Sequence, residues 1–195
     1  DLGDSPSVLP SGYVFVGQYI IGSGANASGA DLSGVDLTDV QFYNANVSGV
    51  NFVGAIFNNT RFHTITYDEN TTIPSGYKFV TSGGKNYLIG PNLDMRNITY
   101  SGADFSGADL TGVDLTSSVL NGTITGPLLG SSPSVLPSGY VFAGQYIIGS
   151  GANASGADLS GVDLTDVQFY NANLSGVNFV GATFNNTRFH TITYD

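Results

Sequence analysis

The aspartates are the residues of this sequence whose type and spacing most readily suggest chemistry, because they recur at intervals of five and crowd together in two places. Three carboxylates within nine residues could coordinate a hard cation such as Ca²⁺. All but Asp39, however, directly precede a large apolar residue, where a short carboxylate can accept a backbone hydrogen bond and brace a turn. We therefore expect bracing rather than a metal site. The aspartates are Asp31, Asp36, Asp39, Asp104, Asp109 and Asp114.

Residues for catalysis are scarce. The chain has no Cys and only two His, His63 and His190, which occupy the same position in two copies of one sequence. Each histidine directly follows a large apolar residue, so its side chain should point outward. No serine is flanked as in a nucleophile elbow, and no glycine-rich loop of phosphate-binding form opens a helical segment. We expect no enzymatic activity and no cofactor.

The sequon N-x-S/T is enriched and occurs nine times. Part of the excess follows from the repeats described below, which put Asn and Ser at fixed positions. The asparagines within those repeats should face outward, where they could accept N-linked glycans in a secreted protein. The sequence thus predicts an extracellular or cell-surface glycoprotein, with glycans at the candidate sites Asn26, Asn46, Asn58, Asn70, Asn97, Asn121, Asn153, Asn173 and Asn185.

Charge and hydropathy exclude two classes of partner. The net charge is −10, with five Lys and Arg against fifteen Asp and Glu. Nucleic-acid binding needs a basic face, so we expect no nucleic-acid partner. No apolar run approaches the roughly 20 residues that cross a bilayer, so we expect no membrane span.

Internal repetition divides the chain into blocks. Residues 5–68 align with residues 132–195 with three differences in 64 positions. Each copy opens with the motif LPSGYVF, and a variant, IPSGYKF, stands between them at 73–79. The sequence therefore predicts four segments: 1–4 as the tail of a preceding block, block A at 5–68, block B at 69–131, and the second block A at 132–195.

The order of the blocks suggests a longer array. DLGDS at 1–5 matches LLGSS at 128–132, where block B closes. The simplest account is a window on an A–B array with a 127-residue unit, although a single duplication explains the same pattern. Neither end carries a recognisable cap, and uncapped solenoid ends invite pairing. We expect end-to-end stacking on another copy or segment.

Apolar residues return every five positions within the blocks, a spacing that neither a helix nor a strand produces. In block A the large residue of each pentad runs from Leu32 to Tyr67, with a small or β-branched residue two positions earlier. The remaining positions are mostly Asp, Asn, Ser, Thr and Gly, which favour tight turns. Each pentad therefore offers one large and one small side chain to an interior.

This pattern resembles the pentapeptide repeat family, whose consensus is A-(D/N)-L-x-x. The matching pentads include ADLSG at 30–34, VDLTD at 35–39, ADFSG at 103–107 and ADLTG at 108–112. The resemblance implies an all-β fold, a right-handed quadrilateral β-helix with four pentads per coil, whose inward residues stack on residues 20 positions away.

The stretches that begin with the PSGY motifs depart from the consensus. They cover 9–21, 73–89 and 136–148 and are called the PSGY segments below. Their turns differ in length while the flanking apolar runs are alike, which is typical of hairpins. We expect them to interrupt the β-helix as short β-hairpins, with an irregular coil as the alternative.

The pentad frame predicts which large side chains fill the interior of the β-helix. They should stack in columns along its axis, each over an equivalent residue of the neighbouring coil. This predicted structural core consists of Leu32, Leu37, Phe42, Phe52, Phe57, Phe62, Phe105, Leu110, Leu115, Leu159, Leu164, Phe169, Phe179, Phe184 and Phe189.

Two functions fit these observations. The near-identity of the copies, the low charge and the sequons favour a structural protein, a segment of a long extracellular fibre or surface stalk built from tandem repeats that can form a filament. The alternative follows from the family resemblance: some pentapeptide repeat proteins are acidic rods that mimic DNA and bind a topoisomerase. A module for adhesion or other binding remains a further alternative.

Overall fold

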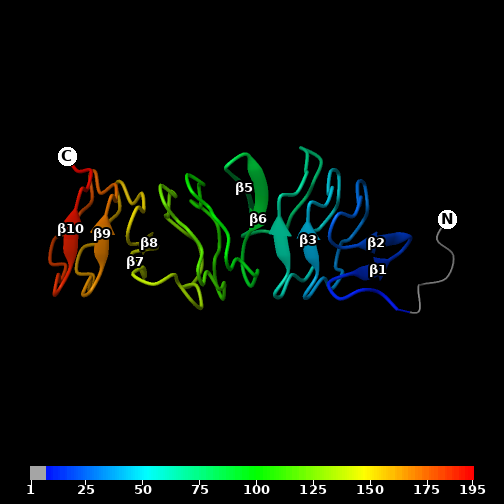
Figure 1. The fold of residues 1–195 in the computed structure, drawn as a ribbon, viewed down its shortest axis with the longest axis horizontal. Helices are drawn as coiled ribbons and strands as arrows, with labels where there is room; N and C mark the ends of the chain where they lie inside the picture. Colours follow the sequence, from blue (N-terminus) through cyan, green and yellow to red (C-terminus); the bar gives the residue numbers. More distant parts are fainter. Residues whose placement is uncertain (1–7) are drawn as a thin grey trace.

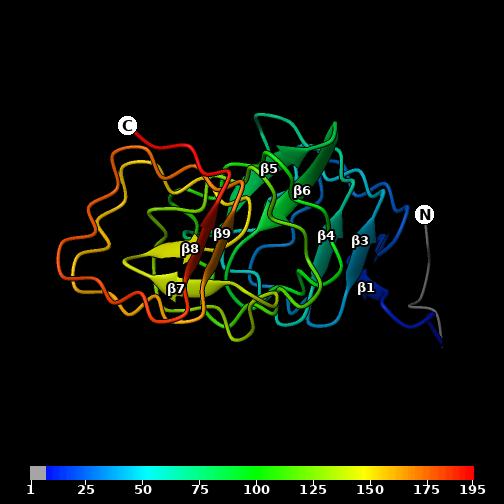
Figure 2. The same ribbon diagram turned by 60° about the vertical axis from the view of Figure 1, so that its left-hand side comes forward.

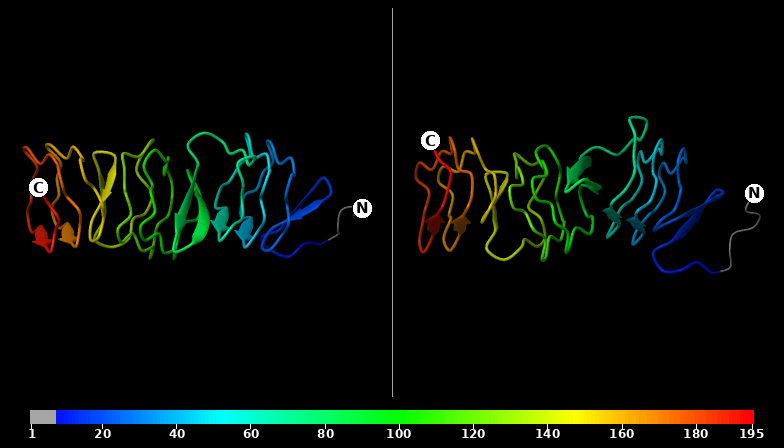
Figure 3. Two further views of the ribbon diagram at one scale, coloured as in Figure 1. Left: turned by 90° about the horizontal axis from the view of Figure 1, so that it is seen from above. Right: turned by 45° about the horizontal axis from the view of Figure 1, so that its top comes forward.

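The computed structural model describes residues 8–195, so segment 1–4 and residues 5–7 of block A lie outside the described residues. The described chain forms one elongated rod along which the sequence advances steadily from one end to the other (Figure 1). The turned views show the same stack of narrow coils (Figures 2 and 3). Residues 8–195 contain strands, bridges and turns and no helix.

The coils are joined by parallel bridges between residues 20 positions apart. Asn26 bridges Asn46, which in turn bridges Thr66. The backbone bonds are regular: Ala27 N–H donates to the carbonyl of Asn46 at 2.9 Å, and Asn46 N–H donates to the carbonyl of Ala25 at 2.9 Å. Twenty residues hold four pentads, so each coil has four sides, and the chain is an all-β repeat fold.

One side of the coil is regular enough to form named strands. β3 (Gln41–Tyr43) pairs in parallel with β4 (Arg61–His63), and β9 (Gln168–Tyr170) pairs in parallel with β10 (Arg188–His190). Each strand has three residues because a pentad leaves room for one short side and one corner. The parallel register sets Phe42 over Phe62, with the rings stacked at 4.4 Å.

The corners explain the glycines and asparagines of the repeat. Gly29 has a φ of 72° and Asn44 a φ of 55°, both in the left-handed region. Glycine enters this region without steric cost, and Asn and Asp tolerate it better than other residues do. Residues that favour tight turns therefore stand at the pentad positions whose side chains do not point into the interior.

The interior is a continuous column of the predicted large side chains. Most of them are buried: Leu32, Leu37, Phe42, Phe52, Phe57, Phe62, Phe105, Leu110, Leu115, Leu159, Leu164 and Phe169. The prediction is wrong for Phe184 and Phe189, which are exposed, and Phe179 is only half-buried. These three residues belong to the last coil of the second block A, and no described coil covers that coil.

The PSGY segments form antiparallel strand pairs that interrupt the pentads. The pairs are β1 (Val14–Val16) with β2 (Tyr19–Ile21), β5 (Lys78–Ser82) with β6 (Lys85–Ile89), and β7 (Val141–Ala143) with β8 (Tyr146–Ile148). Two-residue turns join the strands of every pair, so the prediction that the turns differ in length is wrong. The second pair is longer because β5 and β6 have five residues each, whereas the other four strands have three. The β5–β6 pair, near the start of block B, lies between the pentad coils of block A and those of block B along the rod (Figure 1).

A tyrosine and a glycine anchor each PSGY segment in the same way. The Tyr77 hydroxyl donates to the carbonyl of Pro91 at 3.0 Å, and its ring lies where a side chain on Gly90 would project. Burial raises the pKa of Tyr77 to about 12. Tyr13 with Gly22, and Tyr140 with Gly149, repeat this arrangement. The glycine that follows each of these strand pairs is thus required by close packing.

Candidate functional site

The outward aspartates brace the turns of the coils. Asp31 Oδ1 accepts the Ser33 N–H at 3.1 Å and the Asn51 side-chain amide of the next coil at 3.0 Å. Hydrogen bonds from Ser33 hold the pKa of Asp31 below its usual value. The Asp31 carboxylate therefore stabilises the turn that contains it and connects two neighbouring coils.

The other candidate aspartates of the calcium hypothesis are also engaged. Asp36 and Asp104 each accept the backbone N–H two residues ahead at 2.9 Å, and Asp109 and Asp114 do so at 2.8 Å. Asp39 accepts the Asn59 amide at 2.6 Å. Within residues 8–195 no three His, Asp or Glu side chains gather as a metal would require. The geometry supports bracing at all six positions.

Acidic columns along the rod are short. At the equivalent position of the next coil, Asp31 is paired with Asn51 and Asp36 with Ile56. In the second block A, Asp163 is paired with Thr183 of the next coil. Asp94 over Asp114 is an exception, and an arginine side chain lies beside both carboxylates of that pair. The described surface thus presents single carboxylates rather than long acidic stripes.

The two histidines differ in their surroundings although their blocks are nearly identical. His63 packs edge-on against Tyr87 of the second PSGY segment, with ring centroids 5.2 Å apart. Burial first, and the charges of Lys85 and Arg61 second, lower the pKa of His63. His190 is exposed. Both rings contact the hydroxyl of the following threonine, which is a local turn contact.

The nine sequon asparagines lie on the outside of the rod. Six are exposed: Asn26, Asn58, Asn70, Asn97, Asn121 and Asn185. Asn46, Asn153 and Asn173 are partly exposed. The Asn46 side-chain nitrogen donates to Asn26 Oδ1 at 3.2 Å, so the atom that would carry a glycan is held within a side-chain ladder. Asn46 is therefore less accessible to a glycan than the six exposed asparagines.

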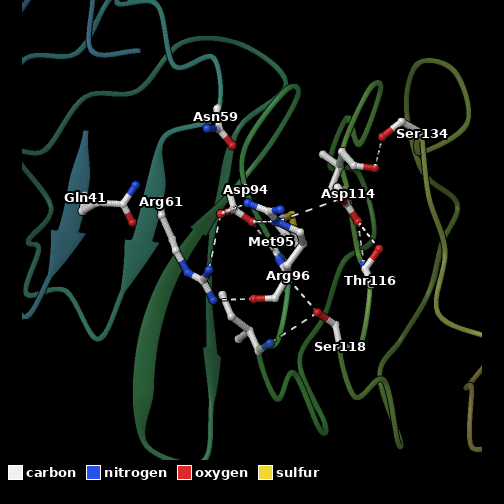
Figure 4. Close-up of polar contacts among 12 residues, drawn as sticks. Gln41, Asn59, Arg61, Asp94, Met95, Arg96, Asp114, Thr116, Ser118 and Ser134 are labelled. Atoms are coloured by element: carbon white, nitrogen blue, oxygen red, sulfur yellow. Dashed lines mark hydrogen bonds and ion pairs between the residues drawn. The ribbon is translucent and has the colours of Figure 1, made fainter. Parts of the chain in front are cut away.

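The most highly connected polar cluster joins block A to block B. Arg61 reaches from β4 to the Asp94 carboxylate of block B at 3.3 Å and also donates to the carbonyl of Arg96 (Figure 4). Its guanidinium lies 5.5 Å from the Tyr43 ring, a cation–π arrangement. Its Nε is buried without a hydrogen-bond partner. The cluster thus links block A to block B through a buried ion pair.

Asp94 is the centre of this cluster and only 8% exposed. Arg96 binds it through Nε and Nη2, both at 2.9 Å. Burial opposes ionisation of the Asp94 carboxyl, but the hydrogen bonds from Arg96 and the charge of Arg61 leave its pKa below the usual value. Because two arginines pair with this one buried carboxylate, Asp94 has a structural role in an ion pair rather than the properties of a reactive group.

Aromatic side chains of the second PSGY segment complete the A–B junction. Tyr77 packs edge-on against Phe57 at 5.2 Å, and Phe79 stacks on Tyr67 at 3.9 Å. These contacts close the end of the block A interior, where Phe57 is 2% exposed. A PSGY segment therefore acts as a lid on the preceding block.

Three backbone hydrogen bonds set the register of this junction. Asn59 N–H donates to the carbonyl of Asn92, and Ile65 N–H to that of Asn86, at 2.8 and 3.0 Å. In the opposite direction, Asp94 N–H donates to the carbonyl of Thr60 at 3.0 Å. Each block thus both donates and accepts backbone hydrogen bonds across the junction, as neighbouring strands of a sheet do.

The junction from block B to the second block A repeats this register. Gly122 N–H donates to Gly151, and Leu128 N–H to Gln145, at 2.6 and 2.8 Å. The return bond runs from Asn153 N–H to the carbonyl of Thr123 at 2.9 Å, and all six residues correspond in sequence to those of the first junction. One docking register therefore serves both kinds of PSGY segment.

A family model decides what kind of chain this is. The model for pentapeptide repeats matches eight copies, at residues 23–62, 92–124 and 150–190, more than half of the chain. The chain belongs to the pentapeptide repeat family. The PSGY segments lie outside the matched ranges, so this pentapeptide-repeat protein combines family coils with hairpins of its own.

Two solved structures resemble this pentapeptide-repeat protein weakly. HetL, a pentapeptide repeat protein involved in heterocyst differentiation regulation in the cyanobacterium Nostoc sp. strain PCC 7120, is 23% identical. The match covers 85% of this chain and 70% of HetL, with a TM-score of 0.29. QnrB1, a plasmid-mediated fluoroquinolone resistance protein, is 12% identical over 87% of this chain and 60% of its own, with a TM-score of 0.20. A comparison with curated proteins finds no match.

Sequence reasoning missed the Arg61–Asp94 contact of this pentapeptide-repeat protein. A signal was present, because Arg61 is the one Lys or Arg in block A and Arg96 stands two residues after Asp94.

No helix in the described residues is long and apolar enough to cross a membrane.

Proposed function

We propose that this pentapeptide-repeat protein is structural, a right-handed quadrilateral solenoid that forms a segment of an extracellular fibre or surface stalk. The observation that carries the proposal is the shared register of the two internal junctions, which use corresponding backbone bonds. Blocks that dock identically can be added along one axis without any new kind of contact, as in other quasi-one-dimensional repeat proteins.

The surface chemistry fits a passive role. The outward aspartates accept hydrogen bonds from neighbouring turns, the buried Asp94 carboxylate is paired with arginine, and the hydroxyl of the following threonine contacts each histidine ring. We propose no enzymatic activity and no cofactor for this chain. The exposed sequons, such as Asn58 and Asn121, support an extracellular location and glycosylation.

DNA mimicry is less well supported. A mimic of duplex DNA needs paired stripes of carboxylates along the rod, since each strand carries a charge about every 3.4 Å. Here the aspartate columns are interrupted by Asn, Ile and Thr, and PSGY segments break the coil stack twice between described blocks. The structural role accounts for these features without requiring a partner.

Electron microscopy of the native protein tests this role. The proposal expects long uniform fibres of a single coil diameter, reduced in apparent width after enzymatic removal of N-linked glycans. Short discrete rods of fixed length, or a protein that co-purifies with a topoisomerase, would overturn it.

A further inference from the structure

The last coil of the second block A presents an apolar end face, defined here as Phe184, Phe189, Tyr194 and Arg188. Phe184 is 39%, Phe189 44% and Tyr194 75% exposed. Their counterparts in block A are covered by the second PSGY segment, as the 2% exposure of Phe62 illustrates. The internal copy therefore shows what kind of element covers this surface: a hairpin with aromatic side chains.

The first PSGY segment carries the aromatic side chains that such a lid needs. Tyr13 and Phe15 stand where Tyr77 and Phe79 stand in block B. Side chains alternate between the two faces of a strand. Val14 and Val16 pack on the core that includes block A, so Phe15 between them points to the opposite side, away from its own block.

The third PSGY segment, which opens the second block A, shows the same alternation in a docked state. Val141 and Ala143 pack on the core of their own block, whereas Phe142 packs on the core of the preceding one. A PSGY segment of the block A type is therefore competent to close a solenoid end. Phe15 is the counterpart of Phe142.

The backbone groups of the two ends are complementary in the same register. On the end face, Asn186 N–H, Ile192 N–H and the carbonyl of Thr187 form no backbone hydrogen bond with described residues. At the start of the first block A, the carbonyls of Gly24 and Gln18 and the N–H of Asn26 are likewise without one within residues 8–195. By sequence correspondence, these six groups are the three pairs that join each internal junction.

We propose that the end face of one copy docks on the first PSGY segment of a second copy, head to tail, in the register of the internal junctions. The proposal rests on the structural role above and names its assembly contact. Phe184 then packs against Tyr13 and Tyr194 stacks on Phe15, as Phe57 and Tyr67 do with Tyr77 and Phe79. Head-to-tail docking of identical units gives open linear chains rather than a closed dimer.

The intermolecular contact lacks one element of the A–B junction. Arg188 corresponds to Arg61, but the residue it would meet in a second copy is Asn26, where block B has Asp94. The docking of copies is therefore weaker than the internal junction. The variant Asn26→Asp restores the carboxylate and should tighten association about threefold despite adding negative charge. Asn70→Asp makes the same charge change at an exposed sequon asparagine away from the contact and serves as its control.

Disulfide trapping tests the geometry, because the chain contains no Cys. Two single variants, Tyr194→Cys and Phe15→Cys, are mixed and oxidised. The expected result is a cross-linked heterodimer from the mixture and little cross-linking of either variant alone. Val53→Cys, exposed on the flank of the rod, measures collisional background.

Three outcomes contradict the proposal: homodimers of Tyr194→Cys, which indicate end faces meeting each other; cross-linking no faster than the Val53→Cys background; or wild-type chains that sediment as monomers at all concentrations. If native fibres are seen but copies do not dock, only the docking proposal fails. If copies dock but the native protein is a short rod, only the structural role fails.

Discussion

Arg61 and Arg188 occupy the same position in two nearly identical blocks, yet only Arg61 has an ionic partner among the described residues. Its guanidinium lies 3.3 Å from Asp94, whereas Arg188 is exposed and makes no ion pair within residues 8–195. The difference arises because block B follows the first copy of block A and no described block follows the second. The environment of each residue is therefore set by the neighbouring block as well as by its own.

The pair supplies a matched test of the A–B junction. Replacing Arg61 by Ala leaves a buried carboxylate with one fewer cation and should lower the free energy of unfolding by about 3 kcal/mol, the low end for a broken buried pair, because Arg96 still binds Asp94. Arg188→Ala should change it by less than about 0.5 kcal/mol. Urea denaturation at low protein concentration measures both, and equal effects would contradict the assigned role of the cluster.

The same logic applies to Phe57 and Phe184, which differ in exposure from 2% to 39%. Phe57→Ala should cost about 3–5 kcal/mol because it opens a cavity in a packed interior. Phe184→Ala should cost markedly less in the monomer, since water already reaches that side chain. Thermal unfolding of the two variants provides the comparison. A larger loss for Phe184→Ala is incompatible with the structure of the last coil.

Gly90 tests the packing of the PSGY segments. An alanine there projects its methyl group into the ring of Tyr77, and overpacking of this kind should cost about 1–3 kcal/mol. Gly84→Ala, at the tip of the same hairpin, meets open space and carries only the strain of its φ of 73°. We expect chemical denaturation to show the greater loss of stability for Gly90→Ala, and the double variant with Tyr77→Ala to show non-additivity. Equal losses for the two glycine variants would argue against the close packing of Tyr77.

The pH dependence of stability follows from His63 and the aspartates. Burial lowers the pKa of His63 in the folded chain, so the unfolded chain takes up a proton first, near its usual value of about 6.5. Stability should therefore fall as the pH drops below about 6.5 and stop falling once folded His63 titrates. A second loss should begin below about pH 4, because Asp31 and Asp36 also have lowered pKa values.

Denaturation across this pH range checks the assignment. His63→Gln should remove the first decline, and His190→Gln should retain it. Stability that rises as the pH is lowered from about 7 to about 5 would have the wrong sign for a histidine with a lowered pKa.

The sequence predicted the repeat well because the pentad is a local code. The alternation of a large apolar residue with turn residues fixes which side chains point inward, and Leu32, Phe52 and Phe105 are buried accordingly. It could not predict the exposure of Phe189, which depends on whether another coil follows. The contact of Arg61 with Asp94 was also missed, because a PSGY segment of variable length separates them along the chain.

Fibre diffraction or cryo-electron microscopy of the native protein tests the central claim, a continuous solenoid of blocks joined in one register. The two copies of block A are offset by 127 residues. Most steps between coils take 20 residues, but the steps from Thr60 to Asp94 and from Ile124 to Asn153 take 34 and 29, so the offset corresponds to roughly five coils. The fibre should therefore show an axial repeat of about 25 Å over a strand spacing of about 4.8 Å. A native particle of fixed short length, or a fibre without this axial repeat, would contradict the account.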